Sequence, residues 1–353
     1  MFGKPVEIDS ESGAQVYLVC ADTRPTDNIY GEQPYGNMTG RWIAVRHFPD
    51  GHRQGGISII DLKDGLRRDV LVGDPRFPAF HAWSEYLYYQ ETIGGKLILR
   101  RCRYDTLETE DIAALPSEMG IFSYGTVSPD HHYYAVSIKE HKDEPAKVYL
   151  LCLETSEWRL LLDKPGYHAK HEQFSRDGEN NVLIQLNHQP CVEQVLLGSL
   201  SVGGYERIFP ADRPWTPRPT GHEAWIGTTD RIFFSTRSDP ESTGNVWSAK
   251  IGDTRATLLC QGEQRFEHVS VSQCGRYWIG DTEEEGIPIY IGRFGSGTSR
   301  RCVFSRTIHD GKQWSHTHPY LTANNEWLIF NSSRNGRAQV YAAKLPPGWL
   351  EGS

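Results

Sequence analysis

The sequence predicts an all-β protein, a seven-bladed β-propeller whose ring is closed when an N-terminal strand joins the last blade. Short runs of β-branched and aromatic residues alternate with Gly, Asp, Asn and Pro along the chain, which is typical of many short strands. A polar turn followed by an aromatic or apolar strand recurs seven times, at a spacing of roughly 45–50 residues. This period is typical of propeller blades.

The seven copies share one pattern, and each is followed by a second strand close by. They are residues 37–48, 81–92, 127–138, 174–186, 225–236, 271–282 and 321–332. We expect each copy to supply part of a four-stranded blade, its opening strand lining the central channel. Little chain remains after the last copy, so residues 13–23 are predicted to complete the last blade. The whole chain, 1–353, is expected to form one propeller domain.

Helical periodicity is scarce. Only residues 105–120 offer one or two helical turns, which Pro116 and Gly120 would end. Every other segment of regular pattern has the period of a strand.

The composition limits the classes of function. A net charge of -8 without a basic block gives no support for binding nucleic acid. No apolar stretch approaches the ~20 residues that span a bilayer, so no membrane association is expected. The N-terminal residues lack the pattern of a signal peptide, and the seven cysteines lack metal or disulfide spacing. These features predict a cytoplasmic protein with buried free thiols.

Histidines gather just upstream of the strands that open the repeats. Those at this position are His81, His168, His171, His222, His268, His316 and His318, and His188 follows on the second strand of the fourth repeat. They make up more than half of the chain's 14 histidines. Because equivalent positions in a propeller meet at one mouth of the ring, the sequence predicts a functional site there.

The segment QWSHTHPY, residues 313–320, suggests metal ligation. Residues i and i+2 of a strand face the same side, so His316 and His318 can converge, and a preceding loop can turn Gln313 toward them. His268 would come from the adjacent blade. Imidazole and amide ligands without thiolate suit Mn, Fe, Ni or Zn. In the competing interpretation, each imidazole simply bonds to the backbone.

These motifs resemble the oligogalacturonate lyases, cytoplasmic seven-bladed propeller enzymes. The resemblance rests on TGHEAW with His222, on His268 before VSVSQCGRYWIGD, and on the closing Q-x-x-H-x-H-P motif. It covers roughly residues 165–345 and implies a divalent metal, Mn²⁺, held by the ligands His268, Gln313, His316 and His318. It also implies that His222 is the catalytic base.

The sequence departs from this family where an arginine normally neutralises the substrate carboxylate. Gln194 stands there, and Arg218 is either its replacement or an ordinary loop arginine. The implied reaction is β-elimination on a small uronate oligosaccharide, either an oligogalacturonide or a rhamnose–glucuronate relative. The product would carry a 4,5-unsaturated uronate.

Other residues of the predicted mouth are assigned to substrate binding. They are His81, His171, His188 and Trp215, and Trp314 is a further candidate for a substrate wall. Two other functions stay open: a non-catalytic propeller that binds a ligand, and a metal-dependent glycan hydrolase with Glu172 or Glu223 as base. The sequence does not predict an oligomeric state.

Overall fold

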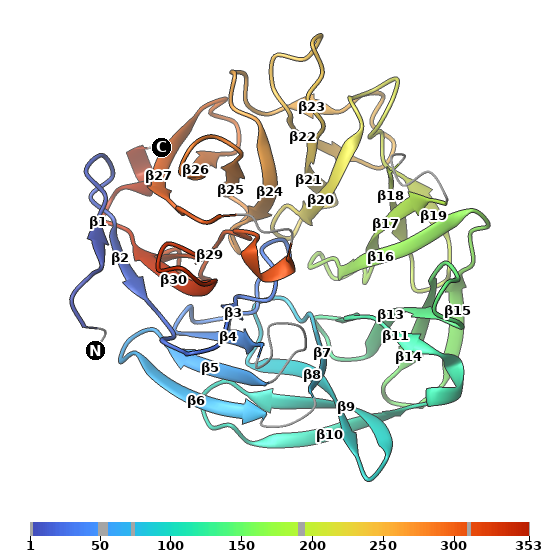
Figure 1. The fold of residues 1–353 in the computed structure, drawn as a ribbon. Helices are drawn as coiled ribbons and strands as arrows, with labels where there is room; N and C mark the ends of the chain where they lie inside the picture. Colours follow the sequence, from blue (N-terminus) through green and yellow to red (C-terminus); the bar gives the residue numbers. More distant parts are fainter. Residues whose placement is uncertain (1–2, 49–55, 72–74, 190–194, 309–311, 353) are drawn as a thin grey trace.

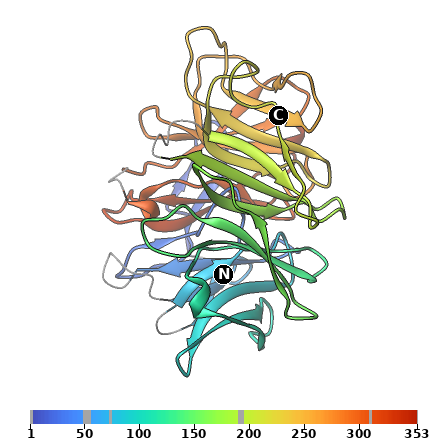
Figure 2. The ribbon, with the colours of Figure 1, turned by 90° about the vertical axis from the view of Figure 1, so that its right-hand side faces the viewer.

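The fold is an all-β propeller with seven blades around a central channel, as the repeats predict. The computed structural model describes residues 3–48, 56–71, 75–189, 195–308 and 312–352. Over these residues the strands form seven antiparallel sheets (Figure 1), and a view from the side shows neighbouring blades edge on (Figure 2). The described residues hold no helix whose length and hydropathy would suit a membrane span.

Each blade runs outward from the channel. Blade one contains β3 (Thr26–Asp27), β4 (Trp42–His47), β5 (Ile57–Asp61) and β6 (Leu66–Leu71). Blade two contains β7 (Pro75–Ala79), β8 (Tyr86–Ile93), β9 (Lys96–Arg103) and β10 (Thr109–Leu115). Blade three contains β11 (Ile121–Phe122), β12 (Thr126–Val127), β13 (Tyr133–Lys139), β14 (Lys147–Cys152) and β15 (Trp158–Leu162). Blade four contains β16 (Tyr167–Phe174), β17 (Val182–His188), β18 (Val195–Leu200) and β19 (Glu206–Ile208).

The remaining blades follow the same order. Blade five contains β20 (Pro219–Trp225), β21 (Arg231–Thr236), β22 (Val246–Lys250) and β23 (Thr257–Leu258). Blade six contains β24 (Phe266–Val271), β25 (Tyr277–Thr282), β26 (Pro288–Arg293) and β27 (Ser299–Phe304). Blade seven contains β28 (Tyr320–Leu321), β29 (Trp327–Ser332), β30 (Gln339–Lys344), β2 (Gln15–Leu18) and β1 (Glu7–Ile8). Three short 3₁₀ turns are η1 (Ser117–Met119), η2 (Gln313–Ser315) and η3 (Leu350–Gly352).

Two expectations about the strands were wrong. The strands that open the repeats lie second from the channel, and the innermost strands are the segments just upstream, such as β24 beside β25. These inner segments mix polar and apolar residues, so their strand pattern is weak. Of the helix expected over 105–120, only η1 forms, because residues 109–115 pair with β9 as the outer strand β10.

The core lies between the blades. Between blades five and six, the Trp278 ring packs 5.7 Å from Phe233 and 5.0 Å from Phe266, measured between ring centroids. Gly292 allows this packing, since a Cβ there would lie 2.2 Å from the Trp278 ring. Because apolar contacts between faces hold the blades, the channel side of each inner strand is free to carry polar groups.

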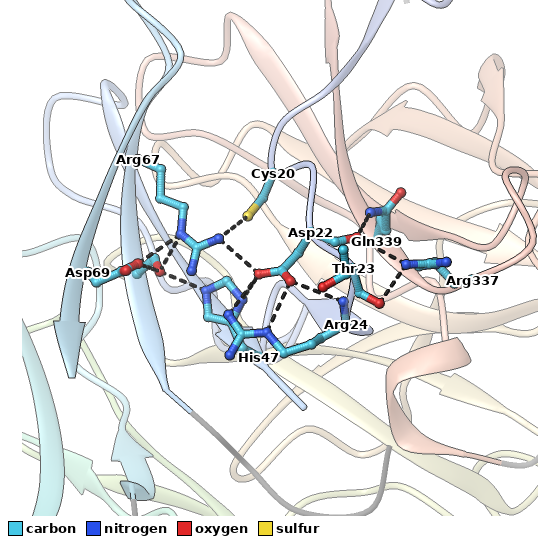
Figure 3. A network of polar contacts seen from close by, with 10 residues as sticks. Cys20, Asp22, Thr23, Arg24, His47, Arg67, Asp69, Arg337 and Gln339 are labelled. Carbon is cyan, nitrogen blue, oxygen red and sulfur yellow. Dashed lines mark hydrogen bonds and ion pairs between the residues drawn. The ribbon is translucent and has the colours of Figure 1, made fainter. Parts of the chain in front are cut away.

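The ring closes where the N-terminal strands join blade seven, as predicted. Strand β2 pairs with β30, and β1 pairs with β2. Just after β2, a polar network links blade seven to blade one (Figure 3). The Asp22 carboxylate lies 2.9 Å from Arg67 and 3.2 Å from Nδ1 of His47, both in blade one. Gln339 of blade seven donates to the Asp22 carbonyl at 3.0 Å.

We expect the closure to be a main source of stability. Val16 of β2 is fully buried in the apolar cluster between blades six and seven, whereas Ile8 of β1 is 60% exposed. Val16→Asp should lower the free energy of unfolding by roughly 3 kcal/mol or more, because it buries an unpaired carboxylate. The matched control Ile8→Asp should change it by about 0.5 kcal/mol or less. Urea unfolding checks both values, and equal effects of the two substitutions would contradict this role of β2.

Candidate metal and catalytic site

A buried loop, residues 28–33, enters the channel from blade one and reaches the opposite blades. This channel loop follows β3 and lies at the centre of the ring (Figure 1). Asn28 Nδ2 donates to the His318 carbonyl at 2.7 Å. Gly31 packs so closely on the same backbone that a Cβ would lie 2.8 Å from the carbonyl carbon of His318. The loop is therefore fixed against the segment that precedes β28.

The channel loop also contacts blade four. The Tyr30 hydroxyl lies 2.8 Å from Nε2 of His171, and the Tyr30 ring stacks on His318 with centroids 4.6 Å apart. Gln33 Nε2 donates to the Glu172 carbonyl at 2.7 Å. One short segment thus connects side chains of blades four and seven that are remote in sequence.

Three histidines from blades six and seven converge beside this loop. The ring nitrogens that His268, His316 and His318 can offer as ligands lie within 4.8 Å of one another. Nε2 of His268 is 3.1 Å from Nδ1 of His316. Two nitrogens bound at right angles to one ion at ~2.1 Å would lie about 3 Å apart, so the spacing fits a shared cation. His316 is half-buried, which leaves the group open on one side.

Asp281 fixes the orientation of His268. Its carboxylate lies 2.9 Å from Nδ1 of His268 and accepts a 2.8 Å hydrogen bond from the backbone N–H of the same residue. Nδ1 is therefore committed to Asp281 and Nε2 faces the other two imidazoles, the arrangement typical of metal-binding histidines. Burial would lower the pKa of His268, but the Asp281 carboxylate outweighs it and the pKa rises to about 9. Burial holds the pKa of His318 well below its usual value, which favours the neutral form that binds metals.

The His-Thr-His segment is not part of a strand, contrary to expectation. It follows η2, and β28 begins only at Tyr320. The two imidazoles still converge, and His318 adopts a left-handed backbone conformation, with φ +42°. The side chain of Gln313 lies outside the described part of the structure, so its predicted role as a ligand stays a prediction.

His222 stands next to this group and is oriented by a carboxylate. It lies on β20, and its ring centroid is 4.6 Å from that of His268 in an edge-to-face arrangement. Nδ1 of His222 forms a short hydrogen bond with Oε1 of Glu32 from the channel loop. On the other side, Nε2 lies 4.0 Å from the half-buried Glu267. An imidazole with a carboxylate on one nitrogen and its other nitrogen facing the site has the arrangement of a general base.

A second polar chain runs behind His222. Nδ1 of His171 lies 3.9 Å from Glu223, whose carboxylate oxygens are buried without a hydrogen-bond partner among the described residues. Burial raises the pKa of Glu223 to about 8, and the nearby Glu32 adds to the effect. Burial also raises the pKa of Glu172 to about 7 and holds that of His171 well below its usual value. Glu223 and His171 are therefore largely neutral near neutral pH, whereas Glu172 is about half protonated there.

Two further predicted residues lie elsewhere in the blades. His81 follows β7 and is buried, with Nδ1 3.2 Å from the Val127 carbonyl and its ring edge-to-face with Tyr88. His188 ends β17 in blade four, where its half-buried ring packs edge-to-face on Tyr167. Of the four residues assigned to substrate binding, His171 contacts the channel loop, through the Tyr30 hydroxyl. All four assignments stay predictions.

Arg218 and Trp215 belong to the loop before β20. Arg218 is exposed and lines a pocket between blades four and five. Trp215 is 43% exposed and lines a separate cavity of about 240 Å³. Gln194, at the position of the family's arginine, lies outside the described residues. That Arg218 replaces this arginine therefore stays a prediction.

Sequence reasoning missed three residues of the site: Tyr30, Glu32 and Asp281. Residues 28–37, NIYGEQPYGN, look like an ordinary turn because they are rich in Gly, Pro and amides. The signal for Asp281 was stronger, since a carboxylate inside the apolar strand YWIGDT must be paired if it is buried.

Comparison with solved structures shows which proteins share this fold. An oligogalacturonate lyase in complex with manganese superposes with a TM-score of 0.78 at 17% identity, over 99% of this chain and 97% of its own. The oligogalacturonate lyase of Vibrio parahaemolyticus gives 0.77 at 15% identity, over 97% and 96%. The propeller domain of the Trilobed protease from Pyrococcus furiosus gives 0.52 at 11%, over 89% and 93%.

No protein-family model and no curated protein matches the sequence. The structural likeness confirms, at the level of the fold, the resemblance that the motifs indicate. The chain is thus a seven-bladed propeller built like the oligogalacturonate lyases, with a three-histidine group able to hold a metal.

The pairing of His268 with Asp281 gives a test of the metal site. Asp281→Asn should weaken the binding of Mn²⁺ or Zn²⁺ roughly 10–100-fold, because the ligand loses the carboxylate that orients it. Asp230→Asn, an exposed residue of blade five, is the matched control and should bind as the wild type does. Calorimetric titration of the metal-free proteins measures both. Equal affinities would show that the Asp281 carboxylate does not support metal binding.

The buried Glu223 predicts how stability depends on pH. Its pKa is about 8 when folded against an ordinary 4.5, so between these values the folded protein keeps a proton that the unfolded chain has lost. This group therefore lowers the free energy of unfolding as pH rises through the window, by at most about 1.4 kcal/mol per pH unit. Glu223→Gln should remove this slope. The free energy of unfolding of the variant should therefore exceed that of the wild type by an amount that grows from about pH 5 to about pH 8.

Urea unfolding across this window measures the slope. The exposed Glu179→Gln serves as control and should keep the wild-type dependence. If the slopes of wild type and Glu223→Gln are the same, Glu223 is ionised in the folded protein.

Proposed function

We propose that the protein is a metal-dependent lyase that cleaves uronate-containing oligosaccharides by β-elimination and leaves a 4,5-unsaturated uronate. The observation that carries the proposal is the adjacency of two features, the three-histidine group and His222 with its Glu32 partner. Such an elimination needs a base for the C5 proton and a positive charge for the enolate-like intermediate. The shared fold with two oligogalacturonate lyases supports this chemistry.

His268, His316 and His318, with Gln313 as the predicted fourth ligand, would hold the divalent cation, which we propose to be Mn²⁺. The donor set fits, because it consists of imidazoles whose orientation is fixed by Asp281 and which suit Mn, Fe, Ni or Zn. When bound, such a cation supplies Lewis-acid stabilisation of the substrate carboxylate as negative charge develops on it.

His222 takes the C5 proton at Nε2 in this proposal. Glu32 on Nδ1 fixes the tautomer that leaves Nε2 unprotonated, and it stabilises the imidazolium that forms. The electron pair of the C5–H bond then forms the C4–C5 double bond as the C4–oxygen bond breaks. In this proposal the Tyr30 hydroxyl, which is hydrogen-bonded to His171, protonates the departing oxygen. Arg218 would assist by charge at the edge of the site.

A hydrolase on the same scaffold is the second candidate, and the structure makes it weaker. Glu172 and Glu223, its predicted bases, are buried, and their raised pKa values keep Glu223 largely protonated and Glu172 about half protonated near neutral pH. Glu267, near His222, is the carboxylate that a hydrolase would use instead. A binding module without catalysis has no need of a histidine oriented by a carboxylate.

The test is an ultraviolet absorbance assay of the Mn²⁺-supplemented protein with oligogalacturonides and rhamnose–glucuronate oligosaccharides. New absorbance that disappears on chelation is expected from the conjugated double bond. His222→Ala should lower turnover by roughly 10²–10⁴-fold while the metal content stays unchanged. His132→Ala, an exposed histidine of blade three, should behave as the wild type does.

Each other outcome of this assay has a defined meaning. New reducing ends without absorbance would identify a hydrolase. Tight binding of a uronate without any product would identify a binding protein. Full activity of His222→Ala would remove His222 from the role of base.

A further inference from the structure

A small cavity lies on the outer part of blade five, on the face of the ring where β20 begins. It has a volume of about 240 Å³ and is formed by residues 213–217, which lead into β20, and by residues of the segment 239–243, between β21 and β22. Because β20 and β21 are antiparallel, these two segments meet at the same end of the blade. Trp247 of β22 and Leu258 of β23 also line the cavity, so it lies further from the channel than His222 does (Figure 1).

Trp215 lines this cavity and belongs to a loop whose backbone is well fixed. Its side chain reaches solvent, and the residue is 43% exposed. The N–H groups of Trp215 and Thr216 both donate to the Asp212 carbonyl at 3.0 Å. The buried Thr216 hydroxyl accepts from the Asp212 N–H at 2.8 Å and donates to the Pro217 carbonyl at 2.8 Å. The exposed indole is therefore presented in one place, and a ligand that stacks on it needs little further ordering of the loop.

A second indole and the limited volume indicate what kind of ligand fits. Trp247 lines the cavity from β22, and its Nε1 donates to Thr236 Oγ1 at 3.1 Å, which fixes the ring. The volume is below the ~300–1,000 Å³ typical of pockets that enclose drug-sized ligands, so the occupant is a small unit such as one sugar ring. The face of an indole is electron-rich and attracts the polarised C–H groups on the flat side of a pyranose. An exposed tryptophan over a small cavity is therefore suited to a sugar.

The charged groups of the cavity disfavour an anion. Arg213, the one cation among the described residues that line it, is ion-paired with Asp239. Oδ1 of Asp239 also accepts a 2.9 Å hydrogen bond from the Glu241 N–H. Glu241 itself is exposed and has no ion-pair partner within the described part of the chain. With one cation and two carboxylates the lining repels a ligand carboxylate, whereas sugar hydroxyls can donate to Glu241.

We infer that this cavity binds an uncharged sugar of the substrate chain, stacked on Trp215 and hydrogen-bonded to Glu241, at a distance from the sugar that reacts at His222. The inference rests on the proposed function and extends it to the substrate class. In a chain of consecutive uronates every sugar carries a carboxylate, which Glu241 repels. A chain in which uronates alternate with rhamnose supplies an uncharged sugar instead. The protein therefore prefers the alternating chain.

Binding to the chelator-treated protein tests this preference without turnover. Calorimetric titration compares a rhamnose–glucuronate tetrasaccharide with tetragalacturonate as probes, and the wild type should bind the first more tightly. Trp215→Ala should weaken binding of the alternating tetrasaccharide about 10-fold or more, because the sugar loses its stacking surface, whereas Trp215→Phe should keep most of the affinity. Neither variant should change binding of tetragalacturonate by more than about twofold. Tyr205→Ala, which removes a 65% exposed aromatic residue of blade four, is the matched control and should bind both probes as the wild type does.

The outcomes separate this inference from the proposed function. If Trp215→Ala, folded by circular dichroism, binds the alternating tetrasaccharide as Tyr205→Ala does, the cavity is not a sugar site. Equal losses for both probes, or a wild type that binds tetragalacturonate as tightly as the alternating chain, would refute the selection of an uncharged sugar. If the predicted loss is found but no unsaturated product forms with Mn²⁺ present, the cavity stands and the elimination is refuted. Unsaturated product without any loss of binding in Trp215→Ala leaves the elimination standing and removes the cavity from it.

Discussion

The site depends on the close contact between the channel loop, residues 28–33, and the backbone of His318. Gly31 can approach this backbone only because it has no Cβ, and Asn28 holds the loop there through the His318 carbonyl and Asn331 of β29. This contact holds Tyr30 beside His171 of blade four and Glu32 beside His222 of blade five. Without the loop, the inner strands of these two blades would face an open channel. Seven similar blades thereby become an asymmetric centre. A residue larger than glycine at position 31 would displace the carboxylate that orients the proposed base.

Apolar packing between the blades offsets the free-energy cost of the strained residues and buried carboxylates at the centre of the ring. Ile29, His171 and His318 all have positive φ, with values of 74°, 60° and 42°, and such residues cost on the order of 1–3 kcal/mol each. The carboxylates of Glu223 and Asp281 are buried as well, the first without a hydrogen-bond partner among the described residues. These costs are tolerated because large side chains fill each interface between blades and because the N-terminal strands close the ring. Strain and buried charge at one place in an otherwise regular fold are typical of functional sites.

The sequence predicts those features that repeat, and it predicts poorly those that occur once. Seven copies of a strand pattern give the number of blades, and the unpaired segment 13–23 gives the closure. The histidines were assigned to one mouth because they precede equivalent strands. That His316 and His318 converge was foreseen, but the strand geometry given as the reason was wrong. Glu32 could not be placed, because its contact with His222 spans 190 positions and depends on how one loop folds into the channel. No local pattern encodes such a contact.

Negative charge gathers around the proposed base. The chain has a net charge of -8, and Glu32, Glu223 and Glu267 all lie near His222, so a polyanionic substrate would meet repulsion here. Burial neutralises Glu223, and Glu32 is engaged by the imidazole. In the proposed function this repulsion is offset locally, on one side by a cation at the three-histidine group and on the other by Lys170, Arg218 and Arg237, which line the pocket between blades four and five. The carboxylate that orients His222 would thus be compensated by positive charge on either side of the imidazole.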